Sequence, residues 1–138
     1  LVRHIAVNDS GEVINPLLLG GQVHGGVAQG IGQALMEQVV YDHEGGGQLV
    51  TGTFADYCLP RADDLPSFNL TFIETPAPSN PLGVKGGSES GTIGAPAAIG
   101  NAVVDALWHL GVRHVPLPIT PQTVWRALET AKQEGPRT

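Results

Sequence analysis

The chain has 138 residues, a length that suits one domain and is too short for two ordinary ones. Its formal net charge is −6 and it holds only 7 Lys and Arg residues, so it lacks the basic surface that nucleic-acid binding requires. No apolar run approaches the roughly 20 residues that cross a bilayer. The single cysteine, Cys58, excludes an internal disulfide framework and fits a reducing compartment.

Charged residues make up only 14% of the chain. This predicts a surface covered by a partner or by the remainder of a longer chain. Dilution of the charges by 19 Gly and 11 Pro explains the low fraction equally well. The chain opens at Leu1 directly in a strand-like run, which favours a fragment or a processed chain.

The first predicted elements are a strand at residues 2–8, a turn at 9–11 and a helix within 20–38. Asp and Ser bond their own backbone and Gly accepts positive φ, which is typical of a turn. Apolar residues recur at every fourth position of 20–38, which is helical spacing. Yet the helix carries glycines that each cost about 1 kcal/mol relative to Ala. Close approach of another backbone or of a ligand is the usual compensation.

The middle of the chain is predicted to contain a hairpin and a further strand. Residues 38–42 and 48–54 flank the Gly-rich loop 43–47, and alternation of apolar and polar residues predicts a strand at 68–72. Cys58 follows the hairpin at an expected strand end, which favours a buried, inert thiol.

Two helices are expected in the last third. Pro96 suits the first turn of one helix and Gly111 its stop. Thr120 and Pro121 predict the start of the other, with an N-cap hydroxyl before Pro at the first helical position. Residues 135–138 are expected to form a frayed tail. The order of elements indicates an α+β fold with a mixed sheet and about three helices.

The first candidate constellation is a polar stripe on the predicted helix 20–38. Gln22, Gly26, Gln29 and Gln33 share one helical face. Amides beside glycines are able to bond a polar ligand that approaches the backbone. A solvated glutamine face is the alternative, and spacing alone favours it, although such a face has no need of glycines.

The second constellation is the Gly-rich stretch 83–94, which leads into a helix. Unpaired backbone N–H groups and the positive end of the helix dipole make such a loop a potential anion cradle. It is not a Walker A loop, because Gly86 follows Lys85, and no nucleophile-elbow spelling is present.

Glu89 is the only acid between Glu74 and Asp105. Glycines beside a carboxylate let a ligand reach it, and a carboxylate shielded from water serves as a general base. A capping acid for the following helix is the alternative, and the residues alone leave both open. The five histidines show no HExxH spacing, so no protein-held metal site is expected.

Two motifs together carry a family resemblance. Residues 21–32, GQVHGGVAQGIG, resemble the glutamine-bearing helix of the xanthine dehydrogenase, aldehyde oxidoreductase and aerobic carbon monoxide dehydrogenase family. Residues 83–96, GVKGGSESGTIGAP, resemble that family's catalytic glutamate loop. The resemblance identifies the chain as the C-terminal segment of a molybdopterin-binding large subunit. Residues 1–134 would then belong to the molybdopterin-binding domain, and 135–138 would be a tail.

The resemblance also implies roles for individual residues. Gln22 would hydrogen-bond molybdopterin, in its cytosine dinucleotide form with molybdenum, and the backbone of Gly86, Gly87 and Ser88 would line this cofactor. Glu89 would be the catalytic base toward a molybdenum-bound hydroxyl. No protein ligand to the metal is implied, because the cofactor's dithiolene holds it. Ser88 stands where the family usually has Gly, which would narrow the pocket or strain the turn.

The implied function is oxidation of an aldehyde, an N-heterocycle or carbon monoxide with water as the oxygen source. The implied partners are the remainder of the large subunit, iron–sulfur and FAD subunits or domains, and a small-molecule substrate. The implied location is the cytoplasm. Neither nucleic-acid binding nor a membrane span is expected. The isolated segment is expected to be inactive. The alternative is a non-catalytic module whose Gly-rich loop binds a phosphorylated ligand or a protein partner.

Overall fold

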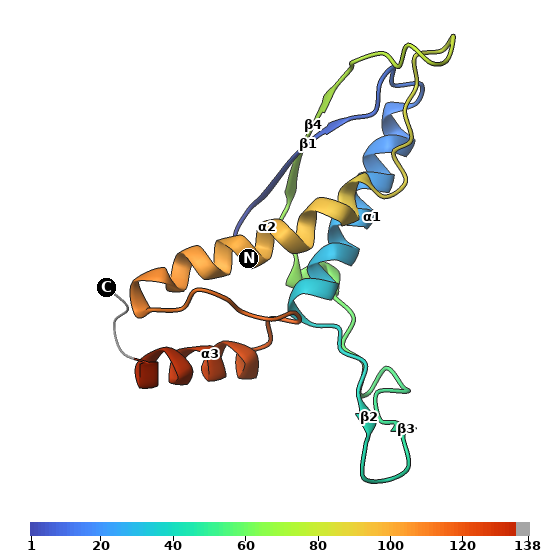
Figure 1. The fold of residues 1–138 in the computed structure, drawn as a ribbon. Coiled ribbons are helices and arrows are strands. Elements are labelled where there is room, and N and C mark those ends of the chain that lie inside the picture. The colour runs from blue at the N-terminus through green and yellow to red at the C-terminus, as the bar shows by residue number, and fades with distance from the viewer. Residues whose placement is uncertain (135–138) are drawn as a thin grey trace. The chain divides into compact units, whose positions relative to one another are not determined.

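The computed structural model describes residues 1–134, which form three α-helices and four β-strands (Figure 1). In chain order these are β1 (His4–Asp9), α1 (Pro16–Leu35), β2 (Tyr41–Asp42), β3 (Gln48–Leu49), β4 (Phe68–Ile73), α2 (Ser90–Leu107) and α3 (Pro121–Glu134). Two 3-10 turns lie at Ala62–Asp64 and Trp108–Leu110. The predicted α+β class is confirmed. The tail predicted at 135–138 lies outside the described residues.

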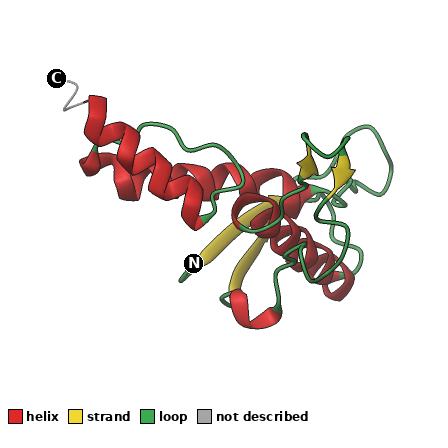
Figure 2. Cartoon of the chain, turned by 90° about the horizontal axis from the view of Figure 1, so that it is seen from below, coloured by secondary structure: helices red, strands yellow, loops and turns green. Residues whose placement is uncertain are grey.

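The strands form two pairs rather than one sheet (Figure 2). β1 runs parallel to β4, with His4 opposite Phe68 and Asp9 opposite Ile73. β2 and β3 are antiparallel and enclose the Gly-rich loop 43–47. The two longer strands match the predicted ones, and the predicted hairpin is present with much shorter strands.

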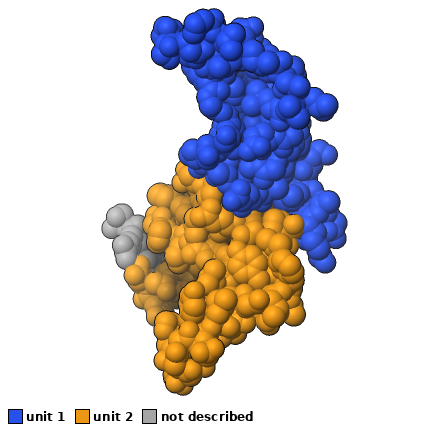
Figure 3. Space-filling view, turned by 90° about the vertical axis from the view of Figure 1, so that its right-hand side faces the viewer, with its two compact units in different colours: residues 1–30, 61–95 blue, residues 31–60, 96–138 orange. Residues whose placement is uncertain are grey.

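The chain divides into two compact units, coloured separately in Figure 3. Unit 1 comprises residues 1–30 and 61–95, and unit 2 comprises residues 31–60 and 96–138. Unit 1 holds the β1–β4 pair, most of α1 and the start of α2. The site residues that the family resemblance implies all lie in unit 1, whereas Gln33 of the polar stripe lies in unit 2.

Helix α1 begins earlier than predicted because Asn15 caps it. The Asn15 side-chain oxygen accepts the N–H of Leu18 at 3.0 Å, and Pro16 occupies the first helical position. Val23 and Val27 are 0% and 1% exposed and anchor the helix in unit 1. The every-fourth spacing of the apolar residues therefore did mark a buried face.

Helix α2 begins at Ser90, so the prediction that Pro96 lies in its first turn is wrong. The Glu89 carbonyl accepts the N–H groups of Thr92 and Ile93 at 3.1 and 3.0 Å, which starts the helix before Pro96. Pro96 then lies inside α2 and donates no hydrogen bond there. Helix α2 itself ends at Leu107, and the 3-10 turn Trp108–Leu110 continues the helical run. The predicted stop at Gly111 ends that turn: its φ is 90° and its N–H donates to the Trp108 carbonyl.

Unit 2 has its own small core. Val112, Val115 and Ile119 are buried, and apolar side chains of α2 and α3 pack against them. The predicted start of α3 is confirmed, because Thr120 Oγ1 accepts the Thr123 N–H at 3.2 Å ahead of Pro121.

Cys58 is exposed, so the expectation of a buried thiol is wrong. The expected strand end is absent there, because residues 54–57 form a turn in which the Thr53 carbonyl accepts the N–H groups of Asp56 and Tyr57. Because Cys58 follows this turn and does not end a strand of a sheet, no neighbouring strand or helix within residues 1–134 covers its thiol.

Tyr57 is predicted to titrate at an unusually high pH. Its hydroxyl donates a 2.8 Å hydrogen bond to the Glu37 carboxylate. This bond, then burial and the Glu37 charge, raises the pKa of Tyr57. A raised phenol pKa stabilises the fold below the unfolded pKa of about 10, and this contribution is lost as pH rises through the folded pKa. The phenolate absorbance of wild type minus Tyr57→Phe should therefore rise only at strongly alkaline pH, and Glu37→Gln should move that rise to lower pH. A difference curve unchanged by Glu37→Gln would contradict this.

Candidate functional site

The Gly-rich loop of unit 1 begins in a segment that is pinned to the turn after β1. The Lys85 N–H donates to the Ser10 carbonyl at 2.9 Å, and the Glu12 N–H donates to the Gly83 carbonyl at 3.1 Å. Gly11 and Val84 form an antiparallel bridge. Gly11 has φ 63°, and a Cβ there would collide with the Gly83 carbonyl. The close approach of these two segments thus requires glycine at position 11.

The tip of the loop rests on α1. Gln22 Nε2 donates a 2.7 Å hydrogen bond to the Ser88 carbonyl. Ser90 Oγ donates to the Gly87 carbonyl at 2.9 Å. A Cβ on Gly87 would lie 3.0 Å from Leu19 Cδ1, whereas nothing lies within 4 Å of a Cβ on Gly86. The loop backbone is therefore packed at Gly87 and open at Gly86.

Two glycines allow α1 and the start of α2 to touch backbone to backbone. A Cβ on Gly91 would lie 2.5 Å from the Val23 carbonyl oxygen and 2.9 Å from the Val27 nitrogen. A Cβ on Gly26 would lie 3.0 Å from the Thr92 nitrogen. The expected compensation for glycine in α1 is thus present at Gly26, whereas a Cβ on Gly25 would meet nothing within 4 Å.

Glu89 occupies the cap position of α2 through its backbone. Its carbonyl accepts the first hydrogen bonds of the helix, and its side chain is exposed. Within residues 1–134 the carboxylate has neither a hydrogen bond nor an ion pair. The carboxylate therefore remains available to a molecule that approaches the loop.

The glutamine stripe of α1 divides into two parts. Gln22 bonds the loop, and Gly26 contacts the start of α2. Gln29 and Gln33 are exposed and bond no other described residue. The alternative of a solvated glutamine face is therefore correct for Gln29 and Gln33. Gln22 and Gly26 instead contact the loop and the start of α2.

A cavity of about 340 Å³ lies between α1, the turn after β1 and the loop. Gln22, Lys85, Gly87 and Ser88 contribute to its lining, together with Ser10. Ser10 is only 4% exposed and its Oγ has no hydrogen-bond partner among the described residues. A buried hydroxyl without a partner and an amide with one N–H and its oxygen unused suit a polar ligand such as a pterin. The residues present therefore fit part of the predicted cofactor.

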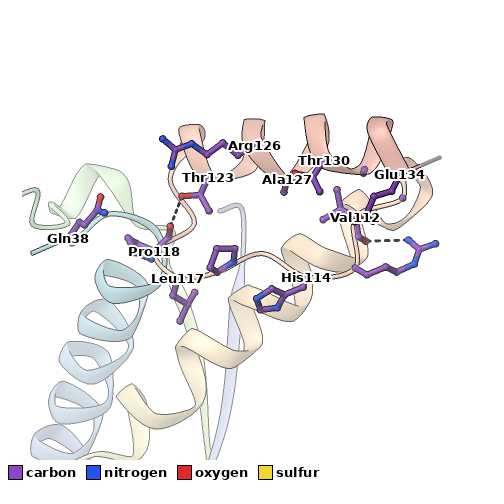
Figure 4. Close-up of a pocket in the computed structure, with 14 residues that line it drawn as sticks. Gln38, Val112, His114, Leu117, Pro118, Thr123, Arg126, Ala127, Thr130 and Glu134 are labelled. Atoms are coloured by element: carbon purple, nitrogen blue, oxygen red, sulfur yellow. Dashed lines mark hydrogen bonds between the residues drawn. The ribbon is translucent and has the colours of Figure 1, made fainter. Parts of the chain in front are cut away.

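A larger cavity, of about 550 Å³, lies in unit 2 between α3 and residues 111–118 (Figure 4). Thr123, Arg126 and Thr130 of α3 line it from one side, and His114 and Leu117 contribute from the other segment. None of the predicted site residues lines it. Size alone therefore does not mark the predicted site.

Three further properties bear on the predictions made from the sequence. Across residues 1–134, no group of three or more His, Cys, Asp or Glu side chains is arranged to hold a metal ion. No non-glycine residue in this part of the chain has a positive φ, so Ser88 does not strain the turn by its backbone. The helices described here include none that is both long and apolar enough to span a membrane.

Sequence reasoning missed three residues that organise the loop. The sequence pattern identifies Asp9 and Ser10 only as turn formers, and Lys85 only as a lysine that is not part of a Walker motif. Asp9 in fact bonds Lys85 Nζ at 2.7 Å, and Ser10 faces Gly87. The opposite charges of Asp9 and Lys85 are the one feature of the sequence that could have indicated this ion pair. The two residues are 76 positions apart, and no local pattern indicates that they meet.

Comparison with known proteins identifies the family of the chain. Residues 1–66 match the family model of a molybdopterin cofactor-binding domain. The nicotine 6-hydroxylase large subunit of Paenarthrobacter nicotinovorans is 49% identical over 122 residues, which is 88% of this chain and 15% of that protein. The chain belongs to the family of molybdopterin-binding large subunits.

Further relatives agree with this family. The carbon monoxide dehydrogenase large chain of Hydrogenophaga pseudoflava is 39% identical over 127 residues, covering 92% of this chain and 16% of that one. The crystal structure of quinoline 2-oxidoreductase from Pseudomonas putida 86 superposes with a TM-score of 0.87 at 47% identity, over 92% of this chain and 16% of the other. The chain thus spans 15–16% of these relatives' length.

Proposed function

We propose that this segment forms the part of a molybdenum hydroxylase that presents the catalytic base and contacts the pterin. The proposal depends on the placement of Glu89. The residue before it, Ser88, accepts a hydrogen bond from Gln22 and lines a cavity that contains a buried hydroxyl, that of Ser10, without a hydrogen-bond partner among the described residues. Membership of the molybdopterin-binding large subunits supports it. No observation on the described residues favours the alternative phosphate- or protein-binding module.

In this proposal, each residue of the site has a separate role. Molybdopterin, when bound, would supply the two-electron acceptor for the substrate's oxidation. Gln22 offers its remaining N–H and its amide oxygen to the cofactor, while Gly86 leaves space for close approach to the loop backbone. Glu89 accepts the proton of the water-derived hydroxyl that attacks the electron-poor carbon.

We infer that the substrate is an aldehyde, an N-heterocycle or carbon monoxide. The named activities of the relatives include hydroxylation of nicotine and dehydrogenation of carbon monoxide. The remainder of the large subunit would supply the other walls of the pocket, and iron–sulfur and FAD subunits or domains would carry the electrons away. The cofactor would be the cytosine dinucleotide form of molybdopterin.

The test is to purify the complete large subunit with the subunits encoded beside it. Molybdenum is measured by elemental analysis, and the nucleotide is identified after acid hydrolysis. The purified complex is then assayed with an aldehyde, an N-heterocycle and carbon monoxide, each with an artificial electron acceptor. Cytidine monophosphate together with turnover of one substrate class is expected. A complex without molybdenum that binds inorganic phosphate would favour the alternative module.

Gln22→Ala in the complete subunit is expected to weaken cofactor retention. The substitution removes the amide groups offered to the pterin and the hydrogen bond to Ser88. Loss of one such bond is worth about 1 kcal/mol, or about fivefold in binding. Molybdenum per subunit after extended dialysis is the measurement, and Gln29→Ala, an exposed glutamine on the same face of α1, is the control. Equal molybdenum in both variants and wild type would remove this role for Gln22.

A further inference from the structure

The Asp9 carboxylate joins three segments of unit 1 that are distant in the sequence. Asp9 Oδ1 accepts the N–H of Gly11 at 3.0 Å and the N–H of Thr75 at 3.2 Å. Asp9 Oδ2 accepts a hydrogen bond from Lys85 Nζ at 2.7 Å. One carboxylate thus ties the end of β1 to the connector after β4 and to the base of the Gly-rich loop.

These contacts give the ion pair a fixed geometry that most surface pairs lack. The two side chains are 35% and 36% exposed, and backbone donors already orient the carboxylate. The pKa of Asp9 lies well below its usual range, chiefly because Lys85 donates to it and then because Gly11 does. A lowered pKa means that the pair is stabilising above the unfolded carboxyl pKa of about 3.9 and is lost only as pH falls toward the folded value. The pair is therefore fully formed at neutral pH.

Lys85 is held by both its backbone and its side chain. Its N–H donates to the Ser10 carbonyl at 2.9 Å and its Nζ donates to Asp9 Oδ2 at 2.7 Å, so both its backbone and its side chain are tied to the end of β1 and the turn after it. Glu89 follows four residues later. Gly86 and Gly87 lie between Lys85 and Glu89. Without the contacts of Lys85, these glycines would allow the loop backbone to adopt many conformations.

We propose that the Asp9–Lys85 ion pair is a positioning device that sets where the loop presents the Glu89 carboxylate. The pair clamps the upstream end of the loop, while the Gln22–Ser88 hydrogen bond and the Gly26–Gly91 contact hold its downstream end. This inference rests on the proposed role of Glu89. A displacement of a catalytic group by about 1 Å is able to cost 10²-fold in rate.

The test uses the complete enzyme complex with Lys85→Met, Lys85→Arg, Asp9→Asn and the double variant Asp9→Asn/Lys85→Met. Lys132→Met is the matched control, because Lys132 Nζ also lies 2.7 Å from a carboxylate, that of Glu129, but in α3. The measurements are kcat, KM, molybdenum content and the thermal midpoint. Glu89→Gln is assayed beside them, so that a failure of the base assignment is distinguished from a failure of the clamp.

Lys85→Met is expected to lower kcat by about 10- to 100-fold with molybdenum retained and KM changed far less, because the base is displaced while the pocket stays. Lys85→Arg should recover most of kcat. The double variant should be no slower than the slower single variant, because both act through one interaction. Lys132→Met should match wild type.

Three results would overturn the proposal. One is a Lys85→Met enzyme within twofold of wild-type kcat while Glu89→Gln is inactive. Another is a loss of kcat that follows loss of molybdenum or of folded protein, which would make the pair structural only. The third is a double variant whose loss equals the product of the single losses.

Discussion

Glu89→Gln in the complete enzyme is expected to retain molybdenum and to lose turnover by about 10²- to 10⁴-fold, the usual contribution of a general base. The substitution keeps the size of the side chain and removes only its ability to take a proton. The capping role of residue 89 is exercised by its backbone carbonyl, which Gln supplies equally. Folding and cofactor loading should therefore be unaffected. Steady-state turnover and molybdenum per subunit are the two measurements.

The control for this variant is Glu74→Gln. Glu74 is exposed and is the acid that precedes Glu89 most closely in the sequence. It should leave kcat unchanged, because it lies outside the loop. Retained turnover in Glu89→Gln would remove the base assignment. A loss of molybdenum instead would indicate that the carboxylate serves cofactor binding or folding.

Gly91→Ala is expected to destabilise the subunit by about 3 kcal/mol, at the upper end of what overpacking usually costs. The added methyl group would lie 2.5 Å from the Val23 carbonyl oxygen and 2.9 Å from the Val27 nitrogen. Both are backbone atoms inside α1, which are unable to move aside as the end of a side chain does. The start of α2 would be pushed from α1, and Glu89 would be displaced with it. A lower thermal midpoint and a lower yield of molybdenum-loaded enzyme are the expected results.

Gly94→Ala provides a matched control in the same helix. A Cβ on Gly94 would meet nothing within 4 Å, so the substitution adds only helix propensity, worth about 1 kcal/mol in favour of Ala. Its thermal midpoint should equal or exceed that of wild type. If Gly91→Ala were as stable as Gly94→Ala, the close backbone contact of Gly26 and Gly91 would be disproved.

The sequence by itself determined the local features and the family. The spacing of Val23 and Val27 predicted the buried face of α1, and Thr120 with Pro121 predicted the start of α3. Each of these depends on residues within a few positions of one another, where backbone sterics and side-chain caps act directly. The two glycine-rich motifs likewise carried the family resemblance without any knowledge of the fold.

Only the tertiary structure decided which residues organise the loop. Lys85 bonds Asp9 across 76 positions, and Gln22 bonds Ser88 across 66. Gly91 meets the backbone of α1 whereas Gly94, three positions later, faces open space. Helix α2 starts at Ser90 because the packed loop places the Glu89 carbonyl there, which overrides the preference of Pro96 for a first turn. Such contacts depend on how distant segments dock, and a local pattern of residue types contains no information about that docking.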